Sequence, residues 1–191
     1  MNIFAIEHGD EIACPIESGQ NQCDKHVVKM PLESAQMLCT AHRILDGYQT
    51  TELSKSGRNL KTWKHSDPYL DKVLYKSVHD NHPCSVWARE SESNYNWLYD
   101  HFISLCIEYK YRYEKDHGCY LKLVDVLKTP PKNIPSGEIT PFKLAMNSNP
   151  ECMFPEDPVK SYRMYYKTKQ DRFKMVWTKR QVPGWFTDAN L

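Results

Sequence analysis

Long hydrophobic runs are missing from this sequence of 191 residues. Its longest apolar stretches span only a few residues, whereas a membrane-spanning helix needs about 20. The opening segment, MNIFAIEHGDE, also lacks the basic region of a secretory signal. We therefore expect a cytoplasmic protein without a membrane partner.

Paired cysteines and glycine-rich catalytic motifs are missing as well. The seven cysteines are an odd number and form no CxxC pair, which is typical of reduced thiols rather than a disulfide framework. The sequence contains no Walker lysine loop, dinucleotide glycine fingerprint or nucleophile elbow, which argues against an NTPase, a dehydrogenase or a hydrolase. Cys23-x-x-His26, Cys39-x-x-His42 and His79-x-x-His82-x-Cys84 are weak hints of metal binding. We interpret them as buried side chains and predict neither a metal nor an organic cofactor.

The composition is that of one folded domain covering residues 1–191. Hydrophobic residues make up 40% and charged residues 26%, and a chain of this length suits a single core. Apolar residues recur every three or four positions in segments 24–45, 68–78, 87–117 and 158–176, which predicts helices. We expect a mainly α domain of four or five helices with a short extended N-terminal segment. Segment 49–66 is polar and is predicted to be a flexible loop.

Charge is distributed unevenly along the chain. Segment 1–24 contains no Lys or Arg, whereas segment 158–186 contains eight cations and a single acid. Aromatic residues alternate with these cations in SYRMYYKTKQDRFKMVWTKR. Because cations bind phosphates and aromatic rings stack on bases, this basic, aromatic helix and tail predict a surface that binds nucleic acid or a nucleotide. The alternative is an amphipathic helix with buried rings. The residues expected to bind are Arg163, Tyr166, Lys167, Lys179 and Arg180.

The first long helix carries a stripe of reactive side chains. Lys25 and His26 precede Lys29 and Glu33 on this stripe. Arg43 continues the stripe toward the end of the helix, and we expect it to bind the substrate. Lysine is a candidate nucleophile, Glu33 a candidate proton-steering carboxylate, and histidine titrates near neutral pH. The alternative is a solvated helix face with an ion pair between Lys29 and Glu33.

The segment NHPCSVWARE lies where one predicted helix ends and another begins. Free backbone donors at a helix N-terminus favour anions. His82, Trp87 and Arg89 are therefore candidate ligand-binding residues, with Trp87 stacking on a base and Arg89 pairing with a phosphate. In the alternative interpretation, Trp87 is a core residue and Arg89 pairs with an acid of the protein.

Three segments, CDKHVVKMPLESAQMLCTAHRILDG, NHPCSVWARESESNYNWLY and DPVKSYRMYYKTKQDRFKMVWTKRQVPGWF, resemble a family of uncharacterised phage-encoded proteins. The layout of MNIF, Glu33 and Asn81-His82-Pro83 also loosely resembles the pyrimidine-dimer DNA glycosylases. That resemblance implies a catalytic carboxylate at Glu33. The family attacks with the amine freed by removal of the initial Met, but Met1 here precedes the large Asn2, so its nucleophile is not carried over.

Two functions follow from these patterns. The leading one is base excision from DNA by a glycosylase or lyase-like phage enzyme that acts in DNA repair in the cytoplasm of the infected cell. The alternative is a counter-defence protein that sequesters a host nucleotide signal without catalysis. Both functions require a phosphate-bearing partner, which is either DNA or a nucleotide.

Overall fold

The computed structural model describes residues 1–54 and 56–188. Within these ranges the chain forms eight α-helices, two short 3-10 helices and a two-stranded antiparallel sheet. The prediction of a mainly α domain with four or five helices was therefore wrong: the fold is a mixture of α and β elements, and it has more and shorter helices. Two physical causes account for this, an unpredicted hairpin and the interruption of long helical patterns.

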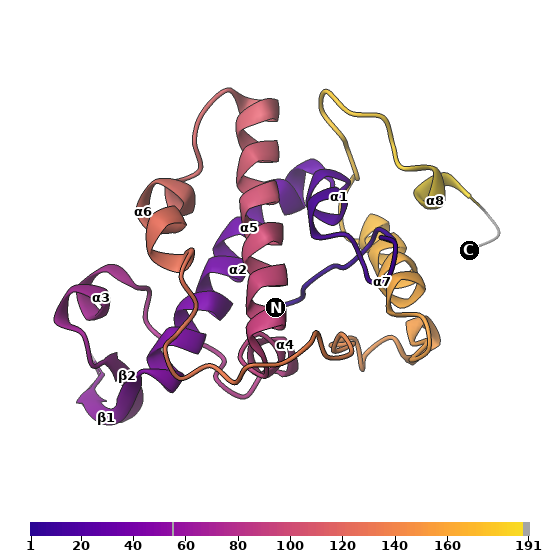
Figure 1. Ribbon diagram of the computed structural model, residues 1–191. Helices are drawn as coiled ribbons and strands as arrows, with labels where there is room; N and C mark the ends of the chain where they lie inside the picture. The colour runs from indigo at the N-terminus through magenta and orange to yellow at the C-terminus, as the bar shows by residue number, and fades with distance from the viewer. Residues whose placement is uncertain (55, 189–191) are drawn as a thin grey trace.

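Two helices of 22 residues each, α2 (Asp24–Leu45) and α5 (Glu92–Tyr113), form the frame of the molecule. They pack across each other near the centre of Figure 1. Leu98, Phe102 and Leu105 of α5 are fully buried, as their spacing predicts. None of the helices in the described ranges is both long and apolar enough to cross a membrane.

The remaining helices cover this frame. The short α1 (Pro15–Gln20) packs on α5, while α6 (Gly118–Leu127) contacts both α2 and α5. The helix α4 (Pro83–Trp87) ends four residues before α5, where the side chain of Ser91 caps the first turn of the longer helix. The segment Ile3–Ile6 threads through the core and is almost fully buried, although it forms no strand.

The segment predicted to be a flexible loop is a β-hairpin. Strand β1 (Gly47–Leu53) pairs antiparallel with β2 (Asn59–His65), and Gly47 lies opposite His65. Threonine favours strands, and Thr50 lies opposite Thr62. Polarity suggested a loop because the strands are polar and only His65 at the end of β2 is buried, so the hairpin lacks the apolar alternation of a half-buried strand.

Two shorter helices are capped by an Asp side chain that precedes a proline. Asp67 caps α3 (Pro68–Val73), and Asp157 caps α7 (Pro158–Lys167), as the Asp-Pro pairs predict. The 3-10 helix η1 (Pro150–Cys152) precedes α7, and η2 (Thr168–Asp171) follows it. The last predicted helix therefore stops earlier than expected. A short α8 (Gly184–Thr187) forms beyond Pro183, because proline is tolerated at the start of a helix.

Candidate functional site

A cavity of about 640 Å³ lies between the N-terminal half of α2 and the segment around η2. All four residues predicted to be catalytic line it, because they share one face of α2. Residues far away in the sequence complete the wall. We call this cavity the cationic pocket; its lining consists of Met1, Asn2, Phe4, Asp24, Lys25, His26, Val28, Lys29, Glu33, Tyr113, Tyr165, Lys169, Arg172 and Phe173.

Both carboxylates of the cationic pocket are already paired. Glu33 Oε1 lies 2.8 Å from Lys29 Nζ, and the Glu33 side chain is 14% exposed. Asp24 pairs with Arg112 at 2.8 Å and accepts hydrogen bonds from Thr178. Burial would raise the pKa of Asp24, but the hydrogen bonds from Thr178 and Arg112 outweigh burial and lower it. The two acids therefore do not neutralise the remaining cations.

Three cations of the pocket have no carboxylate partner within the described residues: Lys25, Lys169 and Arg172. Lys169 is only 6% exposed, and its Nζ lies 3.3 Å from the ring centroid of Tyr165. Lys25 Nζ lies 4.6 Å from the ring centroid of Phe173. A nearly buried ammonium without a counter-ion is costly, so these side chains form a positive site that an anion would stabilise.

His26 is enclosed by aromatic rings. Its imidazole stacks on Phe4 at 4.9 Å between centroids and meets the edge of Tyr166 at 4.9 Å. Burial, reinforced by the charges of Lys29 and Lys169, lowers the pKa of His26 to about 3. The ring is therefore neutral near pH 7, unlike the titrating group that the sequence predicts. Its Nδ1 is buried and has no hydrogen-bond partner within the described residues, so it can serve a ligand.

Phe4 has an uncommon backbone conformation. Its φ angle of 50° lies in the left-handed region, which costs a non-glycine residue about 1–3 kcal/mol. The burial of neighbouring Ile3 and Ala5 holds this conformation in place. As a result, the Phe4 ring forms part of the pocket wall against His26.

Two aromatic residues predicted to contact a ligand belong to the core. Trp87 is fully buried and donates from Nε1 to the carbonyl of Thr140. Tyr166 is also fully buried, and its hydroxyl accepts a hydrogen bond from the backbone N–H of Cys23. Neither residue lines the cationic pocket.

Arg43, His82 and Arg89 hold backbone segments together. Arg43 is 4% exposed and donates to the backbone carbonyl oxygens of four residues, Asp71 among them, and to the carboxylate of Asp71. Arg89 donates to the carbonyl oxygens of Ser85 and Asp80. His82 Nδ1 accepts from the N–H of Cys84 and thereby caps α4. The structure does not bring these three residues to the pocket.

The remaining predicted cations are engaged within the protein. Arg163 pairs with Glu7 at 2.6 Å, Lys179 with Glu114 at 2.8 Å, and Arg180 with Glu108 at 2.8 Å. Lys167 donates to the backbone carbonyl of Asp188. These partners lie far away in the sequence, so the cationic composition alone could not show that the charges are satisfied.

The residues that sequence reasoning missed are Phe4, Tyr165, Lys169, Arg172 and Phe173. Lys169 and Arg172 belong to the recognised cationic segment, but nothing local distinguishes them from its other cations. They are part of the site because η2 and the residue after it line the same cavity as the N-terminal half of α2. No protein-family model, curated protein or solved structure matches this chain, so a ligand has to be assigned from the chemistry of these side chains.

Proposed function

We propose that the cationic pocket binds one phosphate-bearing nucleotide, either free or extruded from a DNA strand. The observation that carries this proposal is the meeting of Lys25, Lys169 and Arg172 with four Phe and Tyr rings in one cavity of about 640 Å³. The cations suit a phosphate, and the rings suit a base. The volume lies within the range of about 300–1,000 Å³ that is usual for small-molecule sites.

An enclosed ligand is favoured over an extended DNA surface. A duplex-binding face needs several free cations in a row, because each neutralises one phosphate. Arg163, Lys179 and Arg180 instead pair with acids of the protein. Lys169, the most buried lysine in the described ranges at 6% exposure, lies inside the pocket. One nucleotide is therefore the ligand that matches the distribution of available charge.

Calorimetric titration with deoxynucleoside monophosphates and with inorganic phosphate tests this proposal. The nucleotides should bind more tightly than phosphate, because only they can use the rings. Lys169→Met keeps the length of the side chain and removes the charge, so it should weaken nucleotide binding by about 10-fold or more. Lys174→Met is the matched control, since Lys174 is exposed in the same segment but does not line the pocket. Equal affinities of the two folded variants would reject the assignment.

A second candidate function is base excision, which the position of Lys29 and Glu33 on the wall of the cationic pocket favours. Their ion pair is also what a solvated helix face would show, so the location in the pocket carries this candidate. The two groups are 2.8 Å apart on the pocket wall, so the Glu33 carboxylate can take a proton from the Lys29 ammonium. The neutral amine would then attack C1′ of the deoxyribose. The bond between sugar and base breaks, and the base leaves with its electron pair and takes up a proton. Opening of the sugar ring yields an imine between Lys29 and C1′.

Borohydride trapping on duplexes that contain a pyrimidine dimer or an abasic site distinguishes excision from sequestration. Excision predicts a covalent adduct of protein and DNA that Glu33→Gln abolishes, while the affinity for DNA is largely kept. Glu114→Gln is the control, because Glu114 also pairs with a lysine but lies outside the pocket. Sequestration instead predicts no adduct and a nucleotide that is released unchanged when the protein is denatured.

A further inference from the structure

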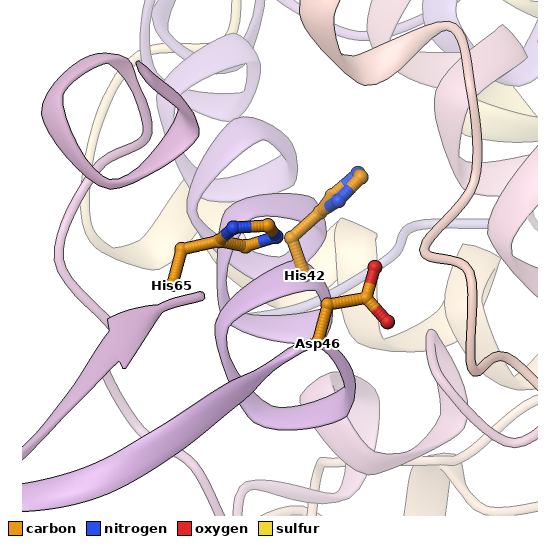
Figure 2. A group of neighbouring side chains, drawn as sticks. All are labelled: His42, Asp46 and His65. Atoms are coloured by element: carbon orange, nitrogen blue, oxygen red, sulfur yellow. The ribbon is translucent and has the colours of Figure 1, made fainter. Parts of the chain in front are cut away.

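A second cluster of reactive side chains lies at the opposite end of α2. His42 is sixteen residues after His26 on the same helix, which corresponds to about 24 Å. One potential ligand atom from each of His42, Asp46 and His65 lies within 4.8 Å of the other two. Figure 2 shows His42 and Asp46 at the end of α2 and His65 reaching in from the end of β2.

The hydrogen bonds of His42 fix which ring nitrogen is free. The Tyr95 hydroxyl donates to the carbonyl of Leu127 at 2.9 Å. Its oxygen must therefore accept from Nε2 of His42, which lies 2.8 Å away. His42 is thus protonated at Nε2 and carries a lone pair on Nδ1. That Nδ1 is buried and has no hydrogen-bond partner within the described part of the chain.

The other two members of the cluster are also positioned by hydrogen bonds. The Asp46 carboxylate accepts from the backbone N–H groups of Lys132 at 2.7 Å and Asn133 at 3.0 Å. His65 is 7% exposed, and its Nδ1 accepts from the N–H of Asp67 at 2.9 Å. Its Nε2 is buried without a partner within residues 1–54 and 56–188. Two nearly buried imidazoles therefore present unsatisfied nitrogens beside an oriented carboxylate.

We propose that His42, Asp46 and His65 bind a divalent transition-metal ion. Two imidazoles and one carboxylate are a common ligand set for zinc and for other first-row metals, and they leave at least one coordination position open. All three residues line a cavity of about 440 Å³, to which Ser66 and Thr129 also contribute. An open position would face this cavity and take a water molecule or an oxygen ligand. With one carboxylate, the occupied site keeps a net positive charge that favours an anionic ligand.

Metal binding requires a small rearrangement. Bonds of about 2.1 Å in a tetrahedral site place ligand atoms about 3.4 Å apart, so the three side chains have to close inward. Coordination by Nε2 of His65 also moves the ring proton to Nδ1. The hydrogen bond from the N–H of Asp67 is then lost, and the amide signal of Asp67 should shift on metal addition.

The sequence predicted no metal because it did not reveal this cluster. His65 lies on a different element from His42 and Asp46, so sequence spacing alone does not bring the three residues together.

The test is titration of the chelator-treated, full-length protein with Zn²⁺ and Co²⁺. We expect one ion per chain and a Co²⁺ spectrum without a band from thiolate ligation. Asp46→Asn and His65→Gln should each weaken binding by about 100-fold or more. Tyr95→Phe, which removes the partner of His42 Nε2 together with the hydrogen bond to Leu127, should weaken it by about 10–100-fold. The matched control is His8→Gln, because His8 is exposed and belongs to another part of the chain.

Two results would overturn the metal site. A thiolate band would show that cysteines hold the ion, and unchanged affinity in the folded Asp46→Asn and His65→Gln variants would show that these side chains are not ligands. A second readout is thermal unfolding: Zn²⁺ should raise the midpoint of the wild-type protein and leave that of Asp46→Asn unchanged. The lining of this cavity shares no residue with the cationic pocket, so nucleotide binding and metal binding succeed or fail independently.

Discussion

Arg180 forms a bidentate ion pair with Glu108, in which Nε lies 3.0 Å from Oε1 and Nη2 lies 2.8 Å from Oε2. The Glu108 side chain is only 1% exposed, although it carries a carboxylate. A second cation, Arg112, donates to the same carboxylate at 2.7 Å. The C-terminal tail is therefore attached to the central helix α5 by one of the residues that the sequence predicts to bind a phosphate-bearing ligand.

Replacement of Arg180 by Ala should consequently reduce stability rather than ligand affinity. We expect a loss of about 1.5–3 kcal/mol in the free energy of unfolding, because Glu108 loses two charged hydrogen bonds and keeps one, from Nε of Arg112. Denaturant titration measures this loss, and Lys174→Ala, which removes an exposed cation, should change stability by less than about 0.5 kcal/mol. Wild-type stability combined with weakened nucleotide binding would assign Arg180 to a ligand instead.

The sequence predicted the parts of the site that depend on local geometry. Lys25, His26, Lys29 and Glu33 meet in the cationic pocket because residues three and four apart share one face of a helix. The burial of the α5 core and the Asp caps of α3 and α7 follow from similarly local patterns. Helical periodicity and capping chemistry are thus sufficient for these features.

Features that depend on partners far apart in the chain were not predictable in this way. Arg43 resembled a ligand-binding residue because its ion-pair partner, Asp71, lies 28 residues away on α3. Lys169 was not selected, although the packing around α2 makes it the most buried cation of the pocket. The β-hairpin was missed because its strands are polar and only His65 among their residues is buried. In each case, the local sequence is compatible with more than one structural role, and tertiary contacts determine which role the residues take.

The core position of Phe102 leads to a second prediction. Its side chain is fully buried on α5, so Phe102→Ala should cost about 3–5 kcal/mol through lost burial and a cavity. Ile107→Ala is a control on the same helix, because Ile107 is 57% exposed and should tolerate the change. Chemical denaturation of both variants measures the difference. Similar stabilities would mean that α5 is not the centre of the core.

Gly47 at the base of the hairpin leads to a third prediction. A Cβ atom at this position would collide with the backbone carbonyls of Arg43 and Lys64. Gly47→Ala should therefore shift β1 away from β2, displace its register partner His65, and weaken both stability and the proposed metal binding. Gly118→Ala is the matched control, since no atom lies near its added Cβ and a helical alanine is favourable. A Gly47→Ala variant that bound metal like the wild type would contradict this role of the hairpin.

The fourth prediction concerns pH, because three imidazoles, those of His26, His42 and His101, are buried in the neutral form. Burial lowers the pKa of His42 to about 4. Burial lowers the pKa of His26 to about 3 and that of His101 to about 3, both well below the ordinary value of 6.5. Between about pH 3 and pH 6.5, the imidazoles of the unfolded chain bind protons that those of the folded chain do not. The contribution to stability is therefore complete above pH 6.5 and falls as the pH drops toward 3. The slope can reach about 1.4 kcal/mol per pH unit for each imidazole.

Denaturant titrations at pH 7.5, 6.0 and 5.0 measure this slope in a window where most carboxyl groups remain ionised. His26→Gln removes one of these imidazoles, so the free energy of unfolding should depend less steeply on pH. His8→Gln should leave that pH dependence unchanged, because His8 is exposed. If the free energy of unfolding stayed constant from pH 7.5 to 5.0, the imidazoles would have to be protonated in the fold. His26 would then offer the cationic pocket a charge rather than a free Nδ1, and a ligand that pairs with an imidazolium would replace the one proposed.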